Sequence, residues 1–139
     1  MLAGALAGLN QANHESPIFE ELYGIVLKTF GMSDVLGKAL GDFGENIQAA
    51  FIFGSVARGT DHASSDIDVM VISDSLAYPE LMAAVHQAET ELGRVVNPKL
   101  YGTSEFREKI ESDNSFVERV MKQPKIFLIG TEDDINQTL

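Results

Sequence analysis

Cysteine is absent from this chain of 139 residues, and basic residues are few, ten Lys and Arg against twenty-one Asp and Glu. Without cysteine, disulfides and thiolate metal sites are excluded, as is usual for proteins of a reducing cytoplasm. The basic residues are scattered singly and the net charge is −11, so no basic stripe is present to hold a nucleic-acid backbone. The apolar opening 1–9 has no basic start and is too short to span a bilayer. We therefore expect a cytoplasmic protein that binds neither membranes nor long nucleic acids directly.

The composition is that of one folded domain. An apolar content of 45% and a charged content of 22% are typical of soluble globular proteins rather than disordered ones. The length allows one domain with a proper core and is too short for two of usual size. We expect a helical or frayed leader over 1–15, a single domain over 16–130 and a polar tail over 131–139.

Hydrophobic periodicity and turn residues predict alternating helices and strands along this domain. The predicted helices are 17–30, 33–43, 55–58, 79–92, 103–111 and 114–123. The predicted strands are 47–53, 66–73, 95–101 and 125–129. The second strand is apolar on both faces and should be buried on both sides, whereas Pro98 places the third at an edge or an irregularity. The pattern predicts an α/β or α+β fold, with helices packed on a small mixed sheet.

Residues that carry chemistry concentrate in one stretch, 51–72. Gly54 and Ser55 form a turn directly after an apolar strand, and Asp66 and Asp68 stand where the next strand begins. Because side chains alternate along a strand, the two carboxylates point the same way. They repel each other and cannot both stay ionised cheaply unless a cation lies between them. Mg²⁺ is the expected ion, because it prefers carboxylate oxygens together with substrate phosphates.

The turn upstream offers the groups that bind phosphate. These are backbone N–H groups at Gly54, the hydroxyl of Ser55 and the cation of Arg58. A phosphate site beside a divalent-metal site is typical of phosphoryl or nucleotidyl transfer. Plainer interpretations stay open: a surface ion pair between Arg58 and Asp61, carboxylates that are solvated or cap a turn, or an ordinary hairpin with an acidic turn.

This pattern resembles the polymerase-β-like nucleotidyltransferase superfamily, whose mark is Gly-Ser, a nearby Arg-Gly, and Asp-x-Asp after a Ser. In this chain the three elements read Gly54-Ser55, Arg58-Gly59 and Ser65-Asp-Ile-Asp68. The resemblance implies a nucleotidyltransferase fold with the active site at one end of the sheet. It also implies an NTP substrate bound through the first two elements, and one or two Mg²⁺ ions on the two aspartates, the first of which Ser65 orients.

The third carboxylate of the superfamily is missing from the expected position. Active members generally carry it on a later strand, after a Gly-Arg-x-Val element in small members, where it deprotonates the attacking hydroxyl or completes the metal site. Here the matching run 93–96 is followed by Asn97, and an amide cannot accept a proton at neutral pH. The loss should slow transfer yet leave nucleotide and Mg²⁺ binding in place. Residues that could face the site or take over this role are Asp74, Lys99, Tyr101 and Glu105.

A narrower resemblance covers nearly the whole chain. Segments 16–22, 28–31 and 36–40, together with Val96-Asn97-Pro98, are similar to a prokaryotic group of small nucleotidyltransferase domains. In that group the domain often follows a DNA-binding winged helix, and we expect no room for one before Ser16 in this chain. The resemblance implies that Asn97 is a trait of a subgroup, and that DNA contact has been lost or moved elsewhere.

Three hypotheses about function follow from these residues. The first is a minimal nucleotidyltransferase that moves a nucleotidyl group from an NTP to a hydroxyl with Mg²⁺ and releases pyrophosphate. Its acceptor is a small molecule or a protein side chain, as in the toxin–antitoxin pairs of the superfamily. The second is a regulatory domain that binds nucleotide without turnover and acts through a protein partner, which Asn97 favours. The third is a purely structural interaction domain.

Overall fold

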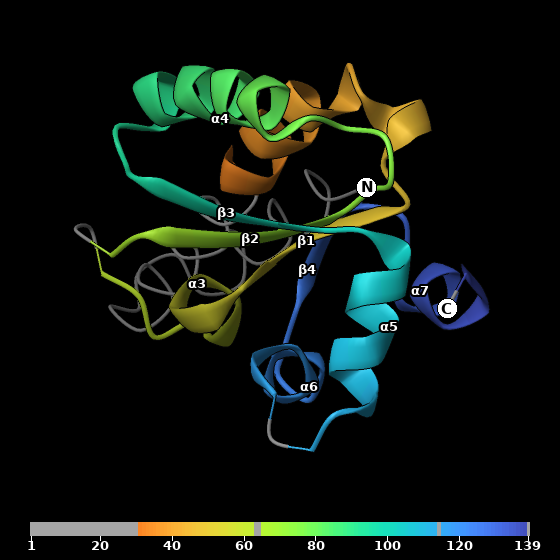
Figure 1. The fold of residues 1–139 in the computed structure, drawn as a ribbon. Coiled ribbons are helices and arrows are strands. Elements are labelled where there is room, and N and C mark those ends of the chain that lie inside the picture. Colours follow the sequence, from red (N-terminus) through yellow and green to blue (C-terminus); the bar gives the residue numbers. More distant parts are fainter. Residues whose placement is uncertain (1–30, 63–64, 114, 139) are drawn as a thin grey trace, which may run out of the picture. The chain divides into compact units, whose positions relative to one another are not determined.

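The computed structural model describes residues 31–62, 65–113 and 115–138 (Figure 1). Its contacts divide the chain into two units, Met1–Met32 and Ser33–Leu139. All candidate site residues, and all the elements named below, belong to the second unit. The predicted leader and the predicted helix after it fall on the first thirty residues, which lie outside the described part.

Helices and strands alternate along the described chain, as the sequence predicts. After a helical segment over 33–41, the elements in chain order are η1 (Gly44–Asn46), β1 (Ala49–Phe53), α3 (Gly54–Arg58), β2 (Ile67–Ile72), α4 (Tyr78–Leu92), β3 (Val96–Tyr101), α5 (Thr103–Glu111), α6 (Phe116–Met121), β4 (Ile126–Ile129) and α7 (Glu132–Thr138). In the portion that is described, none of the helices has the length and apolar character needed to cross a bilayer.

The strands form one mixed sheet in the order β3-β2-β1-β4, which confirms the predicted fold class. β1 pairs antiparallel with β2 and with β4, whereas β2 and β3 run parallel, so α4 supplies the crossover between them. β3 lies at an edge, as Pro98 predicts, because proline lacks the backbone donor that a central strand needs. The register sets Asp68 beside Phe53 on one side and Asn97 on the other.

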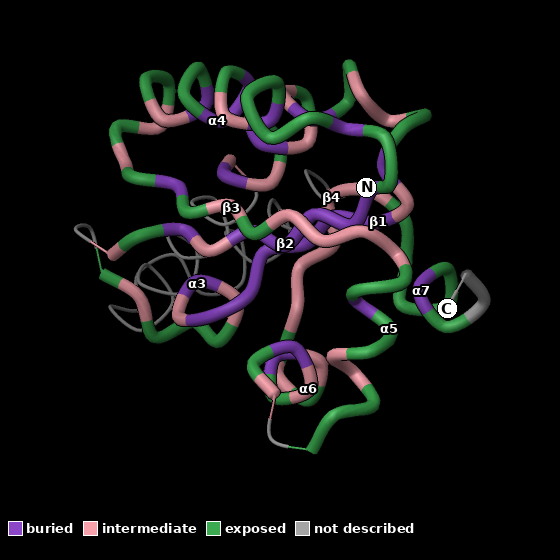
Figure 2. Tube along the Cα trace, in the orientation of Figure 1, coloured by how far each residue is buried: buried purple, intermediate pink, exposed green. Residues whose placement is uncertain are grey.

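Helices cover both faces of the sheet, and its central strands are buried (Figures 1 and 2). On one face lie α4 and the segment 33–41, which bury Leu36, Leu40, Leu81 and Val85. On the other face lie α5 and α6, and the buried cluster there is made of Ala49, Phe51, Phe53, Met70, Ile72, Phe106, Val117, Val120 and Ile135. Because β2 is buried on both faces, any polar group within it must lie at its ends.

α7 forms in a segment for which the sequence predicts only a polar tail. Its Ile135 is 2% exposed and belongs to the buried cluster on the α5–α6 face. Thr131 N donates to Asp134 Oδ2 at 2.9 Å, and Asp134 N donates to Thr131 Oγ1 at 3.2 Å. This reciprocal pair is a capping box, which satisfies backbone donors at a helix start. Thr131 followed three residues later by an acid was the signal in the sequence.

Replacing Ile135 by Ala tests whether α7 belongs to the folded core. Truncating a buried aliphatic side chain removes its burial and leaves a cavity, which typically lowers the free energy of unfolding by about 2–5 kcal/mol. We expect Ile135→Ala near the lower end of that range in urea unfolding. The control is Asn136→Ala at the exposed neighbouring position, which should change the free energy by less than about 0.5 kcal/mol. Equal values for the two variants would show that α7 does not pack on the sheet.

Candidate active site

The two predicted aspartates lie where β1 ends and β2 and β3 begin. Asp66 directly precedes β2 and is exposed, whereas Asp68 lies within β2 and is partly buried. Asp68 pairs with Phe53 of β1 and with Asn97 of β3. Asn97 Nδ2 donates to Asp66 Oδ2 at 2.8 Å. The fold therefore brings Asp66, Asp68 and Asn97 together at one end of the sheet, while their catalytic and metal-binding roles stay predictions.

Gly54 lies directly against Asp68, which belongs to the other half of the motif. The chain turns there from β1 into α3 with a φ of 75°, a conformation that residues with a Cβ rarely adopt. A Cβ at this position would lie 2.5 Å from Asp68 Oδ2. α3 then ends at Gly59, which also has a positive φ, of 76°. Only glycine at 54 allows the carboxylate of Asp68 to lie directly against the turn.

A pocket of about 350 Å³ opens beside this contact. Its lining residues are Phe53, Gly54, Ser55, Arg58, Asp68, Phe116, Arg119, Val120 and Gln123. Arg58 Nη1 donates to Gln123 Oε1 at 3.2 Å, which ties α3 to the residues that follow α6. The volume falls in the range usual for small-ligand sites. The structure therefore gathers Gly54, Ser55 and Arg58 around one cavity, while their phosphate-binding role stays a prediction.

The wall that α6 contributes to this pocket was not predicted. Phe116, Val117, Val120 and Met121 recur at helical spacing, which predicts that they face the core, and Val117 and Val120 are indeed buried there. Phe116 is 39% exposed and its ring packs edge-on against Phe53 at 5.7 Å. Because Phe116 belongs to the same apolar stripe as Val117 and Val120, the sequence gives no signal that it lines a cavity. A larger pocket, of about 510 Å³, lies between the segment 35–43 and α4, on the opposite face from α6.

The surroundings of Asp68 disfavour the ionised form of its carboxyl group. Burial raises the pKa of its carboxyl group above the ordinary value, and the nearby charge of Asp66 raises it further. Lys99, the Asn97 amide and Arg58 lower the pKa of Asp68, but the raising effects prevail. An ionised Asp68 is therefore incompletely compensated by the protein itself.

The donor set fits a hard divalent cation. Asp66 and Asp68 present carboxylate oxygens at the same end of β2, and Mg²⁺ usually takes one or two such groups. Among the described residues, no group of three or more His, Cys, Asp and Glu side chains comes together in a way that could hold a metal ion. An ion on Asp66 and Asp68 would therefore complete its shell with water or phosphate oxygens. That is the usual way in which Mg²⁺ accompanies a nucleotide.

Asp74 and Glu105 do not replace the third carboxylate, so that expectation is wrong. Asp74 follows β2 at its far end and accepts from Thr103 N at 2.8 Å and from Thr103 Oγ1 at 2.7 Å. These two bonds lower the pKa of Asp74 and hold the start of α5, which carries Glu105. Tyr101 also lies at this end, with its ring 6.1 Å from that of Phe106. The expectation that Tyr101 faces the site is therefore wrong as well.

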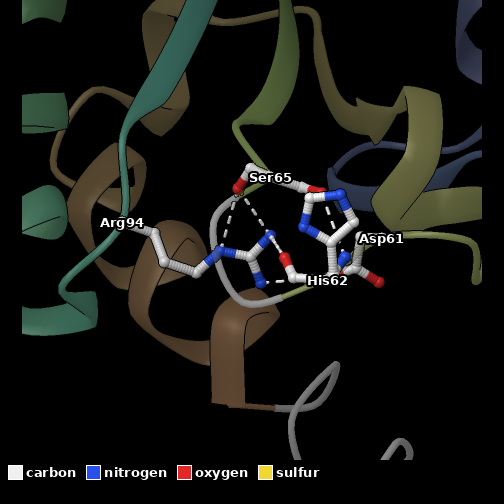
Figure 3. A network of polar contacts seen from close by, with 4 residues as sticks. All are labelled: Asp61, His62, Ser65 and Arg94. Carbon is white, nitrogen blue, oxygen red and sulfur yellow. Dashed lines mark hydrogen bonds and ion pairs between the residues drawn. The ribbon is translucent and has the colours of Figure 1, made fainter.

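The loop between α3 and β2 has its own polar network (Figure 3). Asp61 Oδ2 accepts from Arg94 Nη1 at 3.1 Å, whereas Arg58 donates to a different side chain; the proposed alternative of an ion pair between Arg58 and Asp61 is therefore wrong. Ser65 Oγ accepts from His62 N at 3.0 Å, so its hydroxyl holds the loop. The role of Arg94 in this loop was missed, although its place beside Gly93 in the sequence was noted.

A mixed sheet that sets a Gly-Ser turn against an Asp-x-Asp pair is the arrangement of a nucleotidyltransferase. Residues 38–130 match the profile of the family described as Polymerase beta, Nucleotidyltransferase, and the chain belongs to this family. Among curated proteins, none matches the sequence significantly.

Solved structures of toxin–antitoxin complexes share the fold. One, described as a toxin-antitoxin with AMP-PNP, is 24% identical with a TM-score of 0.57, over 76% of this chain and 79% of the other. Another contains the tri-AMPylated Shewanella oneidensis HEPN toxin in complex with MNT antitoxin; it is 19% identical with a TM-score of 0.53, over 79% of each chain. A mutant of the toxin-antitoxin MntA-HpeT is 25% identical with a TM-score of 0.51, over 73% of this chain and 74% of the other.

Gly54→Ala and Gly59→Ala separate the contact with Asp68 from the effect of backbone conformation. Both glycines have nearly the same positive φ, so each alanine should lower the free energy of unfolding by about 1–2 kcal/mol. At Gly59 the added Cβ meets nothing within 4 Å, whereas at Gly54 it meets Asp68 Oδ2. We expect Gly54→Ala to lose at least about 1 kcal/mol more than Gly59→Ala in urea unfolding. Equal losses would contradict the close contact.

Asp68→Asn should stabilise the protein at pH 7 when no metal is added. Folding raises the pKa of this carboxyl group above its ordinary value of 3.8. The free energy of unfolding therefore falls as the pH rises from 3.8 through the folded-state pKa, and above that pKa the loss of stability is complete. Asparagine cannot ionise, so the deficit disappears. We expect a rise in Tm of about 1–3 °C at pH 7, shrinking as the pH falls toward 4.

The control for this measurement is Asp42→Asn at an exposed position beside α4. Its Tm should follow that of the unchanged protein at every pH, because an exposed carboxylate gains little from its surroundings. Differential scanning fluorimetry across pH 4 to 8 makes the comparison. If Asp68→Asn melts below the unchanged protein at pH 7, the ionised carboxylate stabilises the fold and the electrostatic description of the site is wrong.

Proposed function

We propose that this chain is a minimal nucleotidyltransferase that moves the adenylyl group of ATP to a hydroxyl on a protein partner and releases pyrophosphate. The observation that carries the proposal is the contact between the two halves of the motif, where a Cβ on Gly54 would lie 2.5 Å from Asp68 Oδ2. This contact sets a turn that can bind phosphate directly against a carboxylate that can bind metal. A phosphate chain and a divalent ion can then share one site.

Each site residue has a role in this proposal. Asp66 and Asp68 hold one or two Mg²⁺ ions, which when bound neutralise phosphate charge and stabilise the departing pyrophosphate. Gly54 lets phosphate oxygens approach the backbone, and the Ser55 hydroxyl donates to them. Arg58 lines the same pocket and lowers the pKa of Asp68, so its cation acts at this site. These residues bind and orient the substrate.

The reaction transfers one phosphorus atom between oxygens. The acceptor oxygen bonds to the α-phosphorus, and the bond from that phosphorus to the pyrophosphate oxygen breaks, so pyrophosphate leaves with the electron pair. The proton of the acceptor hydroxyl passes to solvent, because Asn97 is no base at neutral pH. Asn97 instead donates to Asp66 at 2.8 Å and fixes that carboxylate. Without a general base we expect turnover about 10²–10⁴-fold below that of a member with a carboxylate there.

Two observations support ATP and a protein acceptor. The similar structures include a toxin-antitoxin with AMP-PNP, an ATP analogue, and a tri-AMPylated HEPN toxin with its MNT antitoxin. The net charge of −11 disfavours a long polyanion as acceptor. We therefore propose a toxin-like protein of a prokaryotic cytoplasm as the partner, modified on a Tyr, Ser or Thr hydroxyl.

A regulatory domain that binds nucleotide without turnover is the second candidate. Asn97 favours it, because its amide occupies the position of the usual third carboxylate and already bonds to Asp66. Asp66, Asp68 and the pocket beside them would still serve nucleotide and metal binding. The two candidates therefore differ in the chemical step and agree on the site.

Incubation with Mg²⁺, a prokaryotic cell extract and ATP, GTP, CTP or UTP labelled at the α-phosphate tests the proposal. We expect covalent label on a protein, with ATP the best donor. Labelling should fall at least roughly 100-fold in Asp66→Asn and in Asp68→Asn, because one carboxylate cannot hold the ion that stabilises the leaving group. Asn97→Asp should raise the rate by about 10²-fold or more by restoring a base.

Asp42→Asn is the control and should label the same protein at the unchanged rate. If the chain binds Mg²⁺ and nucleotide tightly but forms neither labelled product nor pyrophosphate, even as Asn97→Asp, the regulatory candidate replaces the enzyme. If it binds no nucleotide at millimolar concentration with metal present, both candidates are wrong.

A further inference from the structure

Arg94 is a buried cation outside the residues assigned to the site. Its side chain is 7% exposed, and its guanidinium points into the loop between α3 and β2 (Figure 3). Nη1 donates to Asp61 Oδ2 at 3.1 Å, while Nε and Nη2 donate to the Ser65 carbonyl oxygen at 3.1 and 2.7 Å. Nη2 also donates to the His62 carbonyl oxygen at 3.4 Å. Among the described residues of this loop, Arg94 therefore contacts Asp61, His62 and Ser65.

The loop residues that Arg94 contacts also bond to one another. Ser65 N donates to the His62 carbonyl oxygen at 2.8 Å, and His62 N donates to Ser65 Oγ at 3.0 Å. The Asp61 side chain is 16% exposed, so its ion pair with Arg94 is screened less than a surface pair. The guanidinium therefore binds the backbone of both His62 and Ser65, and Ser65 is covalently joined to Asp66.

The backbone on the other side of Asp66 is held by the same segment of chain. Ile67 N donates to the Val95 carbonyl oxygen at 2.9 Å. Ser65 is held by Arg94 and Ile67 is held by Val95, so two consecutive residues fix both neighbours of Asp66. The direction of the Asp66 carboxylate thus depends on the chain between α4 and β3.

The geometry requires arginine rather than any cation. A guanidinium is planar and offers several N–H donors in fixed directions, so it can serve two carbonyl oxygens and one carboxylate at once. A lysine ammonium is a compact point charge, and it cannot reproduce the paired contacts to one carbonyl oxygen. Loss of the guanidinium would leave the partly buried Asp61 carboxylate and the loop carbonyls without their shared donor.

We propose that Arg94 is a positioning residue, which holds the loop so that Asp66 faces Asp68 and the pair binds a divalent cation. It touches neither the cation nor the nucleotide and acts through Asp66. The inference rests on the proposed function in one respect, namely that Asp66 and Asp68 bind a divalent cation. This proposal gives a physical role to Arg94, whereas the sequence pattern at Gly93-Arg94 by itself suggests none.

Mn²⁺ binding, alone and with AMP-PNP, tests the proposal in the full chain by electron paramagnetic resonance, which counts free Mn²⁺. Removing a group that supports metal ligands typically weakens metal affinity by roughly 10–100-fold, and we expect Arg94→Gln to fall in this range. Arg94→Lys keeps the charge and should be intermediate. In transfer assays Arg94→Gln should raise the metal concentration for half-maximal rate, and saturating metal should restore most of the rate.

Arg107→Gln on the exposed face of α5 is the matched control, because it removes the same charge far from the loop. It should bind Mn²⁺ as the unchanged protein does. Amide hydrogen exchange at Ser65, Asp66 and Ile67 gives a second, metal-free measurement. We expect exchange there to speed up in Arg94→Gln and to stay unchanged in Arg107→Gln.

The outcomes separate this proposal from the proposed function. If the unchanged protein binds Mn²⁺ and folded Arg94→Gln binds it equally well, Arg94 is merely structural and the inference is overturned. If the unchanged protein binds no Mn²⁺ even with AMP-PNP, the proposed function fails, and amide exchange alone decides about Arg94. Faster exchange at Asp66 and Ile67 would then support the positioning role, and unchanged exchange would overturn it.

Discussion

The pairing of β1 with β2 is the constraint on which the site depends. Its register sets Phe53 opposite Asp68, and the next residue, Gly54, turns away with a positive φ and no Cβ. A strand slipped by one residue would point Asp68 to the other face of the sheet. The buried apolar residues of both strands prevent such a slip, since it would expose them. Core packing and site geometry therefore follow from one register.

The carboxylates at this end of the sheet carry negative charge that the neighbouring protein groups balance only in part. Burial and Asp66 raise the pKa of Asp68, and the amide of Asn97 stabilises the exposed Asp66. Functional sites commonly hold such charges at the expense of stability. Arg94 also contributes to the arrangement of the site, because it donates to the carbonyl oxygen of Ser65, the residue before Asp66. Asp66 and Asp68, at this end of the sheet, thus both depend on residues that are distant from them in the sequence.

Local patterns predicted most of the fold, because strands and helices here follow their hydrophobic periodicity. Strand alternation predicted that Asp66 and Asp68 point the same way, whereas the contact between Gly54 and Asp68 becomes visible only in the β1–β2 register of the structure. Features that depend on tertiary packing were not predictable. Phe116 lines the pocket only because α6 packs beside Phe53, and the hydrogen bonds from Thr103 to Asp74 form only because α5 begins beside the end of β2. The place of Asp74 at the far end from Asp66, by contrast, follows from the predicted strand 66–73 that separates the two residues.

The central claim is that the carboxylate pair and the Gly54 turn form one nucleotide–metal site. Diffraction from crystals soaked with Mn²⁺ and AMP-PNP tests it most directly, because manganese is located by its anomalous signal. The account predicts manganese at Asp66 and Asp68, with the phosphates over Gly54 and Ser55 in the pocket lined by Arg58. Manganese away from both carboxylates, or nucleotide in the pocket between 35–43 and α4, would contradict it.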